Sequence, residues 1–188
     1  SSSSATASRA QGFCLSATTE RHRPRVVCCC RCHHGVRVSV AQRLRQLQLA
    51  AKRGSVTANS EEEISRDFRR HVERYLDKGH GACHLRRPEV AELVARAVQH
   101  FEGQRYLLSD WVVMPNHVHA VLWPMPNEVL GEILKSWKQF TSRRAKPMVG
   151  ATDEHFWQPE SFDYWIRDDD EKARICRYIR NNPVTARL

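Results

Sequence analysis

The stretch WVVMPNHVHAVLWP, residues 111–124, decides the fold expected of this chain. It reads as two apolar strands joined at a Met-Pro-Asn turn. His117 and His119 stand two residues apart in the second strand, so both imidazoles leave by the same face of a sheet. Rigid strands would hold the two rings where both can reach one metal ion. The plainer alternative is that both histidines are polar positions on the solvated face of an edge strand.

The composition suits one soluble globular domain, because 188 residues with 41% hydrophobic and 27% charged side chains are ordinary for that class. No apolar run approaches the ~20 residues that a membrane span requires, and the polar N-terminus lacks a secretory signal. We therefore expect a cytoplasmic protein without a membrane partner. Seven cysteines, four of them within residues 28–32, do not form the pattern of a secreted disulfide framework. They also lack the spacing of a zinc site.

Hydrophobic periodicity predicts several helices around the two strands. Ser60 with Glu63 forms a capping box, Pro88 suits a first helical turn, and four acidic residues begin the last helix. Helices are expected over residues 40–53, 60–79, 88–103, 127–140 and 168–183, and strands over 106–114 and 117–123. Asn127 is expected to cap its helix, with Phe140 facing the core, and FWQPESFDYWI is expected to lie in a loop. Residues 1–38 show no clean period, so we expect a disordered or degenerate segment there, with at most a short strand in VVCCC. The main domain is expected over residues 39–188.

The positive charge of the chain is unevenly distributed. Residues 1–60 carry ten Lys/Arg and one acid, whereas residues 61–188 carry twenty of each. Within the neutral part, basic residues gather in two blocks that contain no acid, and each block is a candidate surface for a polyanion such as DNA. The candidate DNA-binding residues are Lys135, Lys138, Arg143 and Arg144 in the first block, and Arg174, Arg177 and Arg180 in the second.

The last predicted helix carries two further candidate site residues. Tyr178 and Asn182 are four residues apart, so they share one helix face about one turn from each other. A phenol and a carboxamide could thus approach the histidine strand together. The alternative interpretation is that Tyr178 is a core aromatic and Asn182 an ordinary C-terminal cap.

Four blocks of the sequence together resemble a known family. They are MPNHVHAVLWP, LGEILKSWKQFTSRRA, FWQPESFDYWIRDDDE and RYIRNNPVTARL, and in this order and at similar spacing they resemble the REP-associated tyrosine transposases. These belong to the insertion-sequence transposases with a histidine-hydrophobic-histidine (HUH) motif and a single tyrosine. The resemblance covers residues 61–188. Because four separate blocks agree, it is more specific than one short motif.

The resemblance implies a ferredoxin-like α+β domain with a central antiparallel sheet and helices packed on it. It also implies a transposase that cleaves and rejoins single-stranded DNA at hairpin-bearing repeats, as a monomer or homodimer. By position, Tyr178 matches the nucleophile that forms a phosphotyrosine link. His117, His119 and Asn182 match the ligands of a divalent ion, Mg²⁺ or Mn²⁺.

One departure from the family concerns the start of the domain. Relatives begin with an aromatic, Thr-rich strand, and this chain has RVVCCCRCHHGVRV in that place. A missing strand would open the sheet, so the alternative function is that of a catalytically inactive, decayed or domesticated DNA-binding relative. Cupin-like enzymes also carry H-x-H on a strand, but they need a Glu a few residues later, and the first acid after His119 is Glu128. Relaxases carry the same HUH motif, but they are usually larger and often have two tyrosines in place of one.

Overall fold

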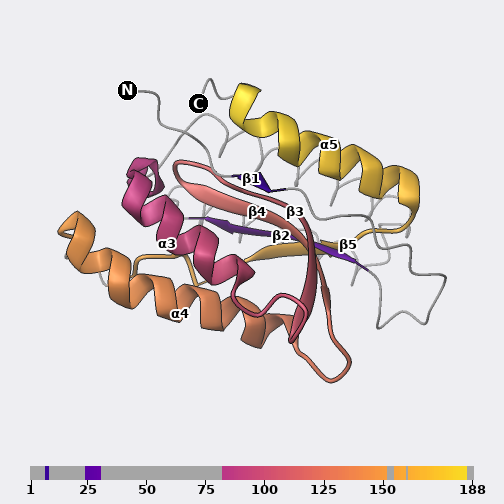
Figure 1. Ribbon diagram of the computed structural model, residues 1–188, viewed down its shortest axis with the longest axis horizontal. Helices are drawn as coiled ribbons and strands as arrows, with labels where there is room; N and C mark the ends of the chain where they lie inside the picture. Colours follow the sequence, from indigo (N-terminus) through magenta and orange to yellow (C-terminus); the bar gives the residue numbers. More distant parts are fainter. Residues whose placement is uncertain (1–6, 9–23, 31–81, 152–154, 160, 186–188) are drawn as a thin grey trace, which may run out of the picture. The chain divides into compact units, whose positions relative to one another are not determined.

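The computed structural model describes residues 7–8, 24–30, 82–151, 155–159 and 161–185. Its helices and strands all belong to one compact unit, formed by Ser1–Arg31 and Cys83–Leu188 (Figure 1). The helices predicted over residues 40–53 and 60–79 lie outside the described residues. None of the described helices is long and apolar enough to span a membrane.

A five-stranded antiparallel sheet forms the centre of this unit. The strands are β1 (Ala7–Ser8), β2 (Arg25–Cys30), β3 (Tyr106–Val113), β4 (His117–Pro124) and β5 (Phe162–Trp165), in the order β1-β3-β4-β2-β5. Every neighbouring pair is antiparallel. The predicted α+β class with a central antiparallel sheet is therefore confirmed. Strand β5 falls in a segment for which the sequence predicted only a loop.

The segment expected to leave a gap in the sheet fills it instead. Strand β2 pairs with β4 over its whole length and with β5 on its other side, so the sheet is not opened. Val27 and Cys29 join the core on one face of the sheet, and Val26 joins the smaller core on the other. A free cysteine packs as a small hydrophobic residue, which lets VVCCC serve as a buried strand. The sheet thus includes residues that precede position 39, where the sequence placed the start of the domain.

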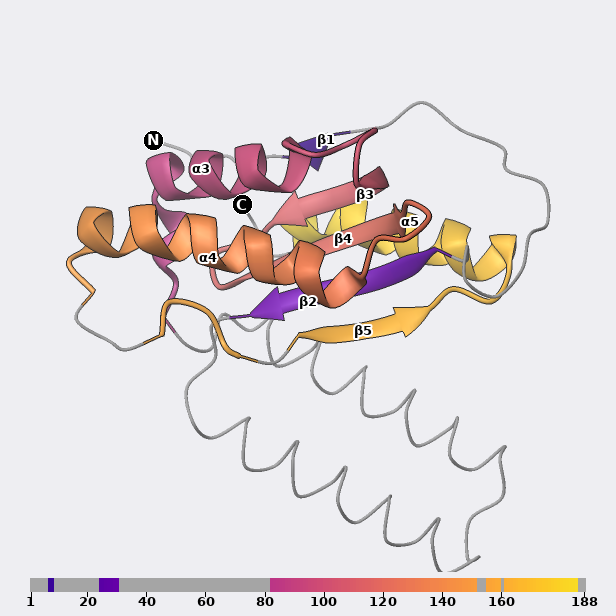
Figure 2. The same cartoon turned by 90° about the horizontal axis from the view of Figure 1, so that it is seen from below.

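Helices cover both faces of the sheet (Figures 1 and 2). Of the described helices, α3 (Pro88–Gln99) and α4 (Leu130–Val149) lie on one face, and α5 (Asp169–Thr185) lies on the other. A short 3-10 helix, η2 (His84–Arg86), precedes α3. Most of the buried apolar side chains lie between the sheet and the α3–α4 layer, so α5 covers the smaller core.

Two details of α4 differ from the prediction. Asn127 does not cap the helix, because it has a φ of 70° and the N-cap position is held by Val129 without a side-chain hydrogen bond. Phe140 was expected in the core but is 42% exposed, and the guanidinium of Arg144 lies 4.6 Å from its ring centroid. Helical periodicity alone could not show that the buried stripe of α4 continues through Trp137 and Thr141 instead.

Candidate active site

The two histidines lie on an inner strand under a helix. β4 runs between β3 and β2, and alternate residues of β4 face opposite layers: Val118, Ala120 and Leu122 join the α3–α4 core. His117 and His119 therefore face α5. Both are buried, and their ring centroids are 4.6 Å apart. The alternative of a solvated edge strand is wrong, because β4 is neither an edge strand nor exposed at these positions.

The turn before β4 supplies a hydrogen bond that orients His117. Nδ1 of His117 lies 2.7 Å from Oδ1 of Asn116, and both side chains are buried. A carboxamide oxygen can only accept, so Nδ1 carries the proton and Nε2 presents its lone pair. Sequence analysis missed Asn116, although its place directly before the H-x-H pair was a usable signal. Metal-binding histidines commonly have such an oxygen behind them.

Burial keeps both imidazoles neutral. It lowers the pKa of His119 from 6.5 to about 4, and burial together with the charge of His119 holds the pKa of His117 well below 6.5. A neutral imidazole is the form that binds metal ions. Nε2 of His119 is buried without a hydrogen-bond partner among the described residues, an arrangement that costs free energy unless another group completes it.

Asn182 also has a buried polar atom without a hydrogen-bond partner among the described residues. Its side chain is buried, and this atom is Nδ2. The neutral histidines, with the orphaned Nε2 of His119, fit a divalent ion that takes nitrogen ligands from the protein and oxygen from water or phosphate. Asn182 would join them through its amide oxygen, because its Nδ2 can only donate hydrogen bonds. The described residues contain no group of three or more His, Cys, Asp or Glu suited to a metal.

α5 brings Tyr178 and Asn182 over the histidines. The Tyr178 ring centroid is 5.6 Å from that of His119, and the ammonium of Lys172 is 4.7 Å from the ring of Trp123, so the helix runs antiparallel to β4. The four residues from Tyr178 to Asn182 cover about 6 Å along the helix axis. The two residues from His119 back to His117 cover about 6.6 Å along the strand, which is a similar distance. This spacing predicts that Asn182 approaches the end of β4 that carries His117. The helix continues to Thr185, so Asn182 does not terminate it.

The predicted DNA-binding residues divide between the two faces of the sheet. Arg174, Arg177 and Arg180 belong to α5 and are exposed on the face that holds Tyr178. Lys135, Lys138, Arg143 and Arg144 belong to α4, on the opposite face. Only the α5 arginines therefore lie in the same layer as the histidines and the tyrosine.

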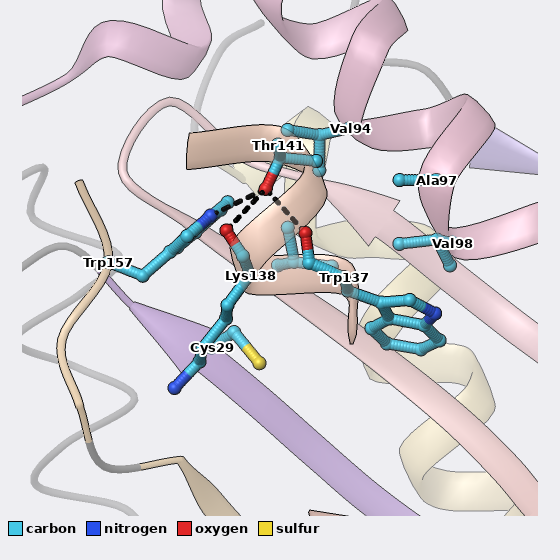
Figure 3. A pocket seen from close by; sticks show the side chains of 9 residues that line it. Cys29, Val94, Ala97, Val98, Trp137, Lys138, Thr141 and Trp157 are labelled. Carbon is cyan, nitrogen blue, oxygen red and sulfur yellow. Dashed lines mark hydrogen bonds between the residues drawn. The ribbon is translucent and has the colours of Figure 1, made fainter. Parts of the chain in front are cut away.

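Three of these cations have hydrogen-bond or ion-pair partners within the fold, and the first, Lys135, forms an exposed ion pair with Glu132 of α4 at 3.3 Å. Lys138 donates hydrogen bonds to the carbonyls of Gln158 at 2.8 Å and Pro159 at 3.1 Å. Figure 3 shows this side chain beside a small apolar pocket, with Trp157 donating to Thr141 Oγ1 at 2.7 Å. Lys138 and Thr141 thus attach the segment before β5 to α4. Arg180, in turn, forms an ion pair with Asp110.

Comparisons with known proteins identify the family of the chain. The family model "Transposase IS200 like" matches residues 86–182, just over half of the chain. Among solved structures, the chain is similar to a REP-associated tyrosine transposase bound to a REP hairpin, with 14% identity, a TM-score of 0.46, and coverage of 93% of this chain and 73% of the other. It is also similar to a proposed transposase from Deinococcus radiodurans R1, with 15% identity, a TM-score of 0.44, and coverage of 93% and 97%. No curated protein matches. On the strength of the family model, which agrees with the resemblance in the sequence, this chain belongs to the IS200-like transposase family.

Proposed function

We propose that this transposase cleaves and rejoins single-stranded DNA at hairpin-bearing repeats through a covalent link to Tyr178. The observation that carries the proposal is the position of the half-buried Tyr178 ring, 5.6 Å from the imidazole of His119 and above a pair of buried neutral histidines. A tyrosine that served only in packing would not explain why two imidazoles able to bind a metal ion lie beneath it. A nucleophile that attacks an anionic phosphodiester needs compensation for developing negative charge.

The proposed step conserves the energy of the phosphodiester bond. The phenol oxygen of Tyr178 attacks phosphorus and loses its proton, while the bond from phosphorus to one sugar oxygen breaks and that oxygen gains a proton. A phenol with an ordinary pKa near ~10 is a fair leaving group, so the phosphotyrosine bond can later be attacked by the hydroxyl of a second strand. Strand transfer requires this reversibility, and simple hydrolysis does not.

His117, His119 and Asn182 are the residues that would hold Mg²⁺ or Mn²⁺, which would stabilise negative charge on a phosphate oxygen. The chain's own residues determine how that oxygen is presented. Burial keeps both imidazoles neutral near neutral pH, the bond to Asn116 leaves Nε2 of His117 without a proton, and α5 covers the two rings. Arg174 and Arg177, exposed on the same helix, are suited to contact the phosphates on either side of the scissile one.

Mapping the DNA-modified peptide tests the assignment. The protein is incubated with labelled single-stranded hairpin DNA, with and without Mn²⁺, and the covalent adduct is digested and sequenced by mass spectrometry. The adduct is expected on Tyr178, and Tyr178→Phe should abolish it. Tyr164→Phe is the matched control, because Tyr164 is a partly buried tyrosine of β5 that packs in the α5-side core.

Two results would contradict the proposal. Adduct on a tyrosine other than Tyr178, or an active Tyr178→Phe protein, would exclude Tyr178 as the nucleophile. DNA binding without any cleavage, in a protein that takes up Mn²⁺ normally, would favour the alternative of an inactive DNA-binding relative.

A further inference from the structure

Asp110 is a buried acid on β3 whose presence the proposed reaction does not explain. Its side chain is only 4% exposed. The pairing of β3 with β4 is irregular between Leu108 and Trp111, so Asp110 lies at a bulge. Bulges redirect side chains, and a buried carboxylate is tolerated only where hydrogen bonds and an opposite charge compensate it.

α5 supplies that compensation. Arg180 binds Asp110 with two parallel bonds, Nε to Oδ1 at 2.5 Å and Nη2 to Oδ2 at 3.1 Å, the geometry in which guanidinium and carboxylate fit each other best. Ser109 Oγ donates to Oδ2 at 3.2 Å, and the Cys176 thiol donates to the same carboxylate. Burial alone would raise the pKa of Asp110, but the bonds from Arg180 and Cys176 hold it below 3.8. Asp110 is therefore an anion that holds α5.

The attachment point lies across the helix from Tyr178. Successive helical residues are about 100° apart, so Tyr178 and Arg180 lie about 200° apart by way of Ile179, which is midway between them. Ile179 is fully buried against the sheet. The two neighbours thus reach to opposite sides of the buried stripe: Tyr178 to His119 of β4, and Arg180 to Asp110 of β3.

This arrangement makes the rotation of α5 about its own axis depend on the ion pair. α5 packs mainly on β3, the strand that carries Asp110, and less on β4, which carries the histidines. A rotation that lengthened the Arg180–Asp110 bonds would move Tyr178 relative to His119. A displacement of about 1 Å at a reacting group can cost about 100-fold in rate.

We infer that Asp110 and Arg180 are positioning residues, which set the rotation of α5 and so hold the phenol of Tyr178 over the histidine pair. This inference rests on the proposed function of Tyr178. It also assigns Arg180 a role other than DNA binding, for which the sequence alone had selected it.

Asp110→Asn, Arg180→Gln and the double variant test the inference. Asp110 is buried and cannot touch DNA, so any effect of Asp110→Asn on cleavage acts through the helix. At saturating DNA, each single variant should lower the single-turnover rate about 10- to 100-fold, and the double variant should be no worse than either single one because both remove the same contact. DNA affinity of Asp110→Asn should not fall.

A second measurement does not depend on activity. In the DNA-free protein, the nuclear Overhauser effect between the ring protons of Tyr178 and His119 should weaken in both single variants. Arg177→Gln is the matched control, since it removes an exposed arginine of the same helix. It should weaken DNA binding and leave the ring contact intact.

Three outcomes separate the possibilities. If Asp110→Asn keeps both the cleavage rate and the ring contact while Arg180→Gln loses DNA affinity, Arg180 is a phosphate contact and the inference is overturned. If Asp110→Asn does not fold, Arg180→Gln still decides, because Arg180 is half exposed. If the wild-type protein does not cleave DNA at all, the proposed function fails, but an unchanged ring contact in Arg180→Gln would still refute the positioning role and a weakened one would support it.

Discussion

Asn116 determines which nitrogen of His117 faces α5. Its Oδ1 accepts from Nδ1 of His117 at 2.7 Å, so the lone pair lies on Nε2. Without that oxygen the ring could turn or change tautomer, and the pair of histidines would no longer present two lone pairs to one ion.

Replacing Asn116 should therefore weaken metal binding without removing a metal ligand. Asn116→Ala is expected to lower Mn²⁺ affinity about 10- to 100-fold in a calorimetric titration, the usual effect of losing an oxygen behind a metal-binding histidine. Asn116→Asp keeps the acceptor and should retain the affinity. Equal Mn²⁺ affinity in wild type and Asn116→Ala would show that the hydrogen bond does not orient the ring.

The sequence predicted some of these residues and could not predict others. The spacing of His117 and His119 specifies a shared strand face whatever the tertiary structure, and the spacing of Tyr178 and Asn182 does the same on a helix. Asn116 and Asp110 act through a turn and a bulge, whose geometry depends on the register between strands. No periodicity in the sequence carries that information.

α5 is the element on which the candidate site depends, and its first turn is well defined. Asp168 accepts from the backbone of Glu171 at 2.7 Å, and Glu171 accepts in return from the backbone of Arg167 at 2.9 Å. The sequence predicted this helix start from its acids, since negative charge stabilises a helix N-terminus. It placed the end two residues early, because Pro183 continues in the last turn of the helix to Thr185.

Cys176 offers a chemical measure of how α5 is docked. Burial, with the hydrogen bond to Asp110 and its negative charge, raises the pKa of the Cys176 thiol to about 11. Only about one thiol in a thousand is then ionised at pH 8, so alkylation should be about 100-fold slower than for an ordinary cysteine and should accelerate as pH rises toward 11. Asp110→Asn removes the charge and should speed the reaction at pH 8.

The alkylation rate of Cys176 can be measured with iodoacetamide and peptide-resolved mass spectrometry. Cys83 serves as the internal reference, because it is partly exposed. Equal alkylation rates for Cys176 and Cys83 in the folded protein would mean that α5 does not close over the Asp110 carboxylate.

Strand β2, unlike α5, could not be predicted from the local sequence pattern. VVCCC has no polar alternation to mark a face, and the basic residues around it suggest a solvated segment. Its position between β4 and β5 comes from the sheet, which buries both of its faces and so requires apolar side chains on each. Its pairing partners are distant in sequence, so local pattern could not identify them.

At the scale of the whole fold, the sheet separates two basic surfaces. Arg174 and Arg177 lie on the α5 face with the candidate site, while Arg143 and Arg144 lie on the α4 face. Arg144 also packs over the exposed ring of Phe140, a pair that can stack on an unpaired base. We expect a DNA long enough to include a hairpin to reach both surfaces, and a short single strand at the site to reach only one.

The two surfaces should therefore respond differently to the length of the DNA. Arg143→Gln with Arg144→Gln is expected to weaken binding of a hairpin-bearing strand and to lower the slope of log affinity against log salt by about two, one for each lost phosphate contact. Binding of a single strand of about six nucleotides should not change. Arg174→Gln with Arg177→Gln should weaken both DNAs, because these arginines flank the site itself. Fluorescence anisotropy over a range of salt concentrations measures all four combinations. If the α4 variant weakened the short strand as much as the hairpin DNA, the α4 face would have to take part in binding at the site, and the separation by the sheet would not govern recognition.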